Sequence, residues 1–312
     1  MECWNIGFFE KNNYSILPIF HYSGIVIAKW ECRVVLTYHT KGVLDTIESR
    51  YLNKGTMFSV LNLNLRFGLA DDGKNSWQFR KRCFPDLFER YHADFIGFQE
   101  ANDFQIEFLN GILVDYGFIG QRSPSPSFWQ NNIIFYKHPW HCTYHEHFYL
   151  SHTTTVPSRF RDSLWPRQCT IGLFKKENRR LICINTHFDF DASVQAHSAK
   201  LILEHLAKLP DEVPVILMGD FNAAPSSPCY NIFTGLAQTP TTAIGGFFKN
   251  AFSKPYPGTY HGFTGDLNRD HIDWILYNGN IIKKNGIVIQ KPINGIYPSD
   301  HFPLYGTFEW IT

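Results

Sequence analysis

The sequence has no excess of charge of either sign. Its 312 residues include 29 Lys and Arg against 28 Asp and Glu, a net charge of +1 at pH 7 with histidine neutral. A near-neutral chain lacks the broad electrostatic field with which nonspecific polyanion binders attract their partners. Recognition of phosphate is therefore expected to be local, and long duplex DNA is a poor candidate partner.

A disulfide framework and a membrane-spanning run are also lacking. The seven cysteines are scattered and never form a CxxC pair, which is typical of a reducing compartment where they act as small buried hydrophobes. No run reaches the roughly 18 apolar residues of a membrane helix. The longest candidate, residues 15–30, is interrupted by Pro18 and His21, and no basic signal-peptide segment precedes it. We expect a cytoplasmic protein without a transmembrane segment.

Apolar residues are plentiful, and they divide the chain into two parts. Hydrophobic residues make up 44% of the chain and charged residues 18%, enough for one large core with an addition. Residues 1–55 are weakly patterned, with candidate strands in GIVIAKW and CRVVLTY. From Met57, MFSVLNLNLRFG alternates apolar and polar residues as a half-buried strand does. We therefore expect an N-terminal extension of unknown role over residues 1–55 and a catalytic domain over 56–312.

Many short strands are interleaved with few helices in this main part. Strands are predicted in 57–68, 93–100, 131–137, 168–176, 179–188, 213–220, 272–278, 286–291 and 302–310. Helical spacing is found in 77–91, which Pro85 should break, in 103–113, and in 191–209, which Asp191 should cap. The pattern predicts α/β layering with more antiparallel hairpins than a doubly wound sheet has.

Acids, amides and imidazoles stand at the ends of these strands. Each alone has an ordinary explanation, because a lone Asn usually bends the chain, a lone Glu is usually solvated and a lone His is usually a satisfied core residue. Together they indicate a site, since open sheets build sites at strand ends. The set is Asn64, Glu100, His187, Asp220, Asn222, Asp273, Asp300 and His301.

In chain order these residues lie in the blocks N, QE, NTH, GDFN, ID and SDH, a series that resembles the endonuclease/exonuclease/phosphatase superfamily. The resemblance covers about residues 57–310; GDFN and SDH are weak alone and specific in combination. It implies an α/β fold, a four-layer α/β/β/α sandwich with two mainly antiparallel sheets packed face to face and helices outside. The site would lie at one mouth of the sandwich.

The resemblance further implies a divalent-metal-dependent phosphoester hydrolase that uses Mg²⁺ or Mn²⁺, ions that prefer hard oxygen ligands. Glu100 would be the principal metal ligand, with Asn64 and Asp300 near the ion directly or through water. Asp220 would orient and deprotonate the attacking water, and Asn222 would hold the nucleophile or a phosphoryl oxygen.

Two histidines would complete the catalytic set. His187 and His301 would donate to the phosphoryl oxygens, which requires them to be at least partly protonated. Asp273 would accept from the far nitrogen of His301 and favour its charged form.

Further residues are expected near the substrate or the first catalytic histidine. Arg167 resembles a position near the phosphate in relatives. Gln130 stands where relatives usually have a Glu that supports the first catalytic His, and a Gln would stabilise charged His187 less. Asp189 is an alternative support, although strand alternation would point it the same way as His187. Phe128 and Trp129, in a proline-rich loop, either pack beneath that loop or contact the substrate.

The expected substrate is a phosphoester, more readily a diester than a monoester, and no pattern predicts an oligomeric state. Two alternatives stay open. One is a nuclease acting on short or single-stranded nucleic acid, for which aromatic residues would supply stacking surfaces. The other is a catalytically silent binding module on the same fold, which retention of the whole polar set disfavours.

Overall fold

The computed structural model describes residues 25–30, 33–38, 57–236 and 247–311. The chain divides into two compact units, Met1–Thr56 and Met57–Thr312. In the first unit, β1 (Ile25–Trp30) and β2 (Arg33–Tyr38) form an antiparallel pair, where the sequence analysis placed candidate strands. The second unit contains all the candidate site residues.

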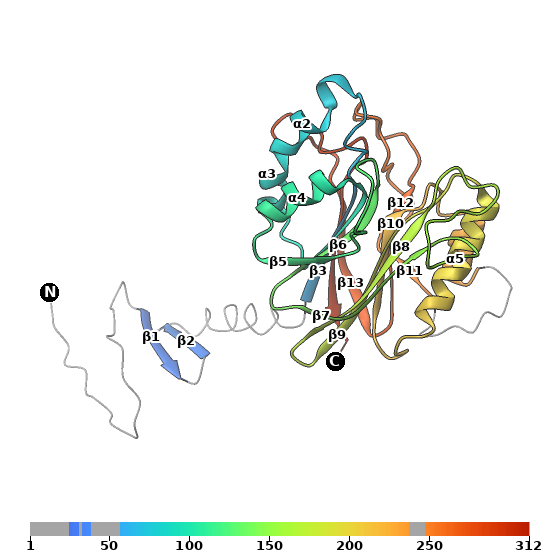
Figure 1. Ribbon diagram of the computed structural model, residues 1–312. Helices are drawn as coiled ribbons and strands as arrows, with labels where there is room; N and C mark the ends of the chain where they lie inside the picture. Colours follow the sequence, from blue (N-terminus) through green and yellow to red (C-terminus); the bar gives the residue numbers. More distant parts are fainter. Residues whose placement is uncertain (1–24, 31–32, 39–56, 237–246, 312) are drawn as a thin grey trace, which may run out of the picture. The chain divides into compact units, whose positions relative to one another are not determined.

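Two six-stranded sheets make up the centre of the second unit (Figure 1). Their strand orders are β13-β14-β3-β4-β6-β5 and β11-β12-β10-β9-β8-β7. In each sheet one neighbouring pair is parallel, β3 with β4 and β9 with β10, and the other pairs are antiparallel. The strands are β3 (Met57–Asn64), β4 (Phe95–Ala101), β5 (Tyr116–Ile119), β6 (Asn131–Lys137), β7 (His141–Tyr149), β8 (Gln168–Lys176), β9 (Arg179–His187), β10 (Val215–Asp220), β11 (Lys249–Asn250), β12 (Asp273–Asn278), β13 (Ile281–Val288) and β14 (Leu304–Trp310).

Helices cover the outer face of each sheet (Figure 1). On the first sheet lie α2 (Trp77–Arg80), α3 (Phe84–Arg90) and α4 (Asp103–Ile112), with the 3₁₀ turns η2 (Gly73–Asn75) and η3 (Lys81–Cys83) beside them. On the second lie α5 (Ala192–Leu206) and α6 (Pro228–Thr234). The fold is therefore the α/β/β/α sandwich that the sequence analysis predicted, with mainly antiparallel sheets.

Helix boundaries follow local chemistry. α5 begins after Asp191, whose Oδ1 accepts hydrogen bonds of 2.9 Å from the backbone N–H groups of Ser193 and Val194. Pro85 lies in the first turn of α3, where its missing N–H costs nothing, so the patterned segment 77–91 is divided into α2, η3 and α3.

Side-chain alternation makes the interface between the sheets apolar at one end and polar at the other. On β3, Phe58 and Val60 enter the core between the sheets, and Asn62 and Asn64 follow at the same parity. β9 repeats the pattern with Leu181 and Cys183 followed by Asn185 and His187, and β10 with Ile216 and Met218 followed by Asp220. The residues between them face the helices instead.

Three fully buried amide side chains join the sheets just below the polar end. Gln99 Nε2 on β4 donates to Asn62 Oδ1 at 2.8 Å and to Asn185 Oδ1, on the opposite sheet, at 2.6 Å. Asn62 Nδ2 donates in turn to the carbonyl of Gly219 at 3.3 Å. Because an unpaired buried amide costs free energy, this network fixes how the two sheets meet.

Gly219 on β10 lies directly beside Thr186 on β9. Its φ is +156°, and a Cβ at this position would lie 2.1 Å from the carbonyl oxygen of Thr186. No other residue fits this approach without moving the backbone, so the glycine of GDFN is required by the packing that places Asp220.

The described part of the chain contains no helix long and apolar enough to cross a membrane. Its cysteines, at 83, 142, 169, 183 and 229, are free, and all but Cys142 are buried. The four buried ones lie as the sequence analysis expected and Cys142 does not, and the cytoplasmic location stays a prediction.

Gly219→Ala is expected to lower the free energy of unfolding by more than about 2 kcal/mol, because the new methyl group meets backbone and the φ is unfavourable. The matched control is Gly111→Ala, at an exposed position of α4 where a Cβ meets nothing within 4 Å. That change should be neutral or stabilising by up to about 1 kcal/mol. Urea unfolding measures both, and equal effects would contradict the argument.

Candidate active site

The ends of the two parallel strand pairs bring the polar residues together. Parallel strands finish at the same edge, so β3 and β4 deliver Asn64 and Glu100 to one side of the mouth. β9 and β10 deliver His187 and Asp220 to the other, and these two residues are paired in register. Asp273, the first residue of β12, is paired with Asp220 from the antiparallel side.

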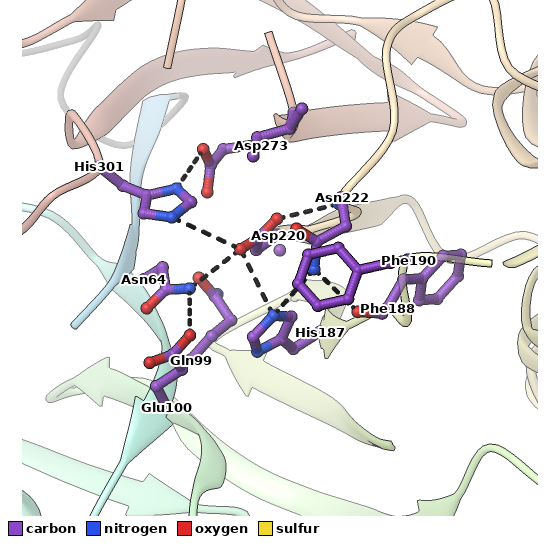
Figure 2. Close-up of polar contacts among 12 residues, drawn as sticks. Asn64, Gln99, Glu100, His187, Phe188, Phe190, Asp220, Asn222, Asp273 and His301 are labelled. Carbon is purple, nitrogen blue, oxygen red and sulfur yellow. Dashed lines mark hydrogen bonds and ion pairs between the residues drawn. The ribbon is translucent and has the colours of Figure 1, made fainter. Parts of the chain in front are cut away.

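Asp220 is the centre of the arrangement (Figure 2). Its Oδ2 accepts from Asn64 Nδ2 at 2.9 Å, and its Oδ1 accepts from the backbone N–H of Asn222 at 2.9 Å. The carboxylate is 1% exposed. Burial, together with the charge of nearby Asp273, raises the pKa of Asp220 to about 7.

His301 faces Asp220 from the other side. Its Nδ1 donates to Asp273 Oδ2 at 2.8 Å, and its Nε2 lies 3.8 Å from Asp220 Oδ2. Burial alone would lower the pKa of His301, but the charges of Asp273 and Asp220 outweigh it and raise the pKa well above its usual value. The ring is therefore an imidazolium held in orientation by Asp273, the pairing that the sequence analysis expected.

His187 is in a different state. Its Nε2 lies 3.1 Å from Asn222 Nδ2, which also donates to the carbonyl of Phe188 at 3.0 Å, so the amide presents its nitrogen to the ring. The same Nε2 lies 3.4 Å from Asp220 Oδ2, so it can accept from the amide when neutral or donate to the carboxylate when protonated. Burial and the positive charges of Arg167 and His301 lower the pKa of His187 well below its usual value. The neutral form of His187 is therefore favoured, and the donor role expected for it needs a proton that its burial disfavours.

Glu100 reaches the mouth through an irregularity in its strand. The register between β4 and β6 shifts after Phe98, and Glu100 has a φ of +58°, rare outside glycine. Its Oε1 accepts from Asn64 Nδ2 at 3.0 Å and its Oε2 from the backbone N–H of Phe67 at 2.6 Å. The bulge turns the carboxylate toward the site, a strain typical of functional positions.

Asn64 and Asp300 complete this side. Asn64 Oδ1 accepts from the backbone N–H of Arg66 at 2.8 Å, so the amide shows its nitrogen to Glu100 and Asp220. In this orientation Asn64 links the two carboxylates and does not offer them its oxygen. Asp300 Oδ1 accepts from Ser299 Oγ at 3.1 Å, and its Oδ2 lies 3.8 Å from Arg66 Nε.

A single cavity of about 960 Å³ receives these groups. Glu100, Asp220, Asn222, Asp300 and His301 all line it, together with His187. The carboxylates of Glu100 and Asp300 therefore open into the same space as Asp220 and do not face separate surfaces.

The donor set fits a hard divalent cation. Glu100, Asp220 and Asp300 place carboxylates in one cavity, where burial and the charge of Asp273 raise the pKa of Asp220, so a cation there would stabilise its charged form. Asp220, Asp273 and His301 also form a compact group, with ligand atoms within 4.8 Å of one another. Glu100 and Asp300 line the cavity whereas Asp273 does not, so they are the more accessible oxygen ligands for Mg²⁺ or Mn²⁺.

Arg167 enters the cavity from the loop before β8. It is 8% exposed, and its Nε lies 3.7 Å from Asp189 Oδ2. Asp189 also accepts from Ser163 Oγ at 2.7 Å. Asp189 therefore supports Arg167 and not His187. Gln130 lines the cavity, but within the described residues no hydrogen bond joins its side chain to His187; its carbonyl accepts from Gln168.

The comparisons with known proteins identify the family. A model described as the Endonuclease/Exonuclease/phosphatase family matches residues 61–301. The chain belongs to the endonuclease/exonuclease/phosphatase family. Members of this family are hydrolases of phosphoesters and generally depend on a divalent metal. No curated protein matches the sequence.

Solved structures share the fold of this family member. An endonuclease/exonuclease/phosphatase family protein from Bacteroides thetaiotaomicron has a TM-score of 0.72 at 24% identity, over 82% of this chain and 98% of its own. A mannosyl-6-phosphatase from the same species has 0.71 at 23%, over 81% and 100%. D. rerio TDP2 complexed with a single-strand DNA product has 0.62 at 16%, over 81% and 99%.

Sequence reasoning missed several residues that hold the site. Asn62, Gln99 and Asn185 tie the sheets together, and Arg66 links two loops through ion pairs with Asp72 and Asp300. The amides carried a readable signal, because each is a polar residue at the inward parity of an apolar strand. No pattern in the sequence indicated that Arg66 would pair with Asp72 and Asp300.

Asp220→Asn should reveal the buried charge through stability. A folded-state pKa raised to about 7 means that the native protein holds the proton more tightly than the unfolded chain, so stability falls as pH rises from about 4 through 7. Asn mimics the protonated acid and escapes this loss. With chelator present, the variant should gain on the order of 1–4 kcal/mol relative to wild type between pH 5 and 8.

Chemical denaturation at several pH values measures this difference. The matched control is Asp162→Asn at an exposed position, whose difference from wild type should stay constant over the same range. If the stability difference between Asp220→Asn and wild type did not change with pH, the folded protein would not raise the pKa of Asp220.

Proposed function

We propose that the protein is a divalent-metal-dependent phosphodiesterase that binds Mg²⁺ or Mn²⁺ through Glu100 and Asp300. The observation that carries the proposal is the convergence of Glu100, Asp220 and His301 on one cavity. Family membership supports the reaction class, and the ester and the metal are inferred from the residues. When bound, the metal would neutralise charge on the phosphoryl oxygens and make a bound water more acidic.

Asp220 is the general base. It takes a proton from the attacking water as the water oxygen bonds to phosphorus and the bond to the leaving oxygen breaks; the departing oxygen takes a proton from solvent. Asn64 and the backbone N–H of Asn222 hold the carboxylate in place, one bond to each oxygen. The pKa of about 7 suits a base that works near neutral pH.

Positive and polar groups around the base bind the phosphoryl oxygens. His301 donates from Nε2, and Asp273 keeps that ring charged and oriented. Arg167 lies at the cavity wall, with its Nε 3.7 Å from Asp189 Oδ2. Asn222 contacts His187, and the negative charge of a bound phosphate would favour protonation of His187, the condition for its expected donor role.

Charge balance favours a diester over a monoester. Each cation that faces the base is already paired with a carboxylate, Arg167 with Asp189 and His301 with Asp273. Apart from the metal, the cavity therefore has little uncompensated positive charge. A diester has one negative charge and a monoester up to two, so the diester needs less compensation.

The two alternatives to this proposal are a nuclease and a catalytically silent binding module. A nuclease on short or single-stranded nucleic acid is a phosphodiesterase with a defined substrate, and D. rerio TDP2 has been solved with such a product. The mannosyl-6-phosphatase shows that a monoester enzyme shares the fold. A silent binding module is disfavoured by the intact bonds among Asp220, Asn64 and Asn222, which a site without chemistry has no need to keep.

Hydrolysis of bis(p-nitrophenyl) phosphate with Mg²⁺ or Mn²⁺ tests the proposal. EDTA should abolish it, and Asp220→Asn should lower kcat by at least about 10²-fold, since the base is lost. Glu100→Gln should raise the metal concentration for half-maximal rate at least about tenfold. Glu107→Gln, at an exposed position of α4, is the matched control and should change neither. Absence of turnover on diesters and monoesters would favour the silent module.

Asp273→Asn tests whether His301 acts as a charged donor, because the change removes the negative charge beside its ring. Without the carboxylate the pKa of His301 should fall, so the protonated form is lost at a lower pH. The alkaline limb of the kcat profile should then move toward acid, while KM changes little. An unchanged limb would mean that His301 does not act as a charged donor.

A further inference from the structure

Three loops place exposed aromatic rings around the mouth of the catalytic cavity. Phe128 comes from the loop before β6, Trp165 from the loop before β8 and Phe190 from the segment after β9, and each is 62% exposed. All three line the same cavity as the catalytic carboxylates. We call these three residues the aromatic rim. Single exposed rings are ordinary, but three from separate loops around one cavity mark a binding surface.

The backbone beneath the rings is anchored. Asn102 Nδ2 donates to the carbonyls of Ser127 at 3.3 Å and Trp129 at 2.8 Å, on both sides of Phe128. The carbonyl of Trp165 accepts from Ser163 Oγ at 2.7 Å. Loops held in this way present their side chains with little ordering cost on binding.

Phe190 connects the rim to the catalytic groups. Its backbone N–H donates to Asp189 Oδ1 at 2.8 Å, and the guanidinium of Arg167 lies 5.7 Å from the ring centre. Figure 2 shows its ring on the side of the catalytic cluster, whereas Phe188 points away into the core. A group bound against Phe190 would therefore be attached close to the reacting phosphorus.

The charges of the residues that line the cavity indicate what kind of group binds at the aromatic rim. Among the described residues that line the cavity, the two arginines are already paired, Arg66 with Asp72 and Arg167 with Asp189. A longer polynucleotide would bring flanking phosphates past the rim, and such phosphates need free Lys or Arg side chains. The rim offers ring faces in their place, which suit one flat and uncharged group.

We infer that the aromatic rim binds a planar aromatic ring in the organic part of the substrate, so that the preferred substrate is a small phosphodiester carrying one such ring, as a nucleoside ester does. The inference rests on the proposed phosphodiesterase activity for its kinetic test only. Stacking of one ring is worth about fivefold to a hundredfold in affinity.

The kinetic test compares methyl esters, so that the leaving group carries no ring of its own. Thymidine 5′-(methyl phosphate) should have kcat/KM at least tenfold above dimethyl phosphate. Cyclohexyl methyl phosphate, which is apolar but not planar, should stay near dimethyl phosphate. Equal rates for the thymidine ester and dimethyl phosphate, or for the thymidine and cyclohexyl esters, would overturn the inference while leaving the phosphodiesterase proposal intact.

Variants locate the effect. Trp165→Ala should reduce the preference for the thymidine ester over dimethyl phosphate at least fivefold. Leu164→Ala is the matched control, because Leu164 is 64% exposed beside Trp165 but does not line the cavity, and it should keep the preference. A loss in both variants, or in neither, would contradict a role for the ring.

A binding measurement decides the inference even if no ester is hydrolysed. Calorimetric titration with thymidine 5′-monophosphate should show at least fivefold weaker binding to Trp165→Ala than to wild type. Ribose 5-phosphate, which has the phosphate without the base, should bind both proteins equally. Equal binding of the nucleotide to wild type and Trp165→Ala would overturn the inference, whereas failed hydrolysis alone would sink only the phosphodiesterase proposal.

Discussion

The buried bridge between the sheets is the constraint on which the site depends. Gln99 bonds at once to Asn62 on its own sheet and to Asn185 on the other, and Asn62 reaches the carbonyl before Asp220. These amides can be satisfied in few relative positions of the two sheets, because each unpaired group would cost free energy. The same positions bring the ends of the two parallel strand pairs together at one mouth.

Crowded negative charge gives the site its chemistry. Glu100, Asp220 and Asp300 open into one cavity, and burial raises the pKa of Asp220. The charges of Asp273 and Asp220 raise the pKa of His301, whereas burial and the charge of Arg167 lower the pKa of His187. A hard cation would relieve the remaining repulsion, which links the expected metal to the protonation of the base.

In this fold the strand ends hold the proposed catalytic groups and the loops hold the aromatic rim. The groups proposed to act on phosphorus stand on strand ends that the sheet interface fixes, and proteins at 23–24% identity share this fold. The aromatic rim stands on loops, each anchored by its own side-chain bonds. Substrate choice is therefore expected to vary with the loops while the reaction class does not.

The sequence by itself determined the layered fold, the cap of α5, the break at Pro85 and the strand ends that carry the site, because periodicity and local chemistry are properties of neighbouring residues. It also gave the pairing of Asp273 with His301 through the family resemblance. Only the tertiary structure decided that the neutral form of His187 is favoured, that Asn64 presents its nitrogen and that Asp189 supports Arg167. These depend on charges and donors brought close from distant segments, and the spacing of residues along one chain contains no record of such contacts.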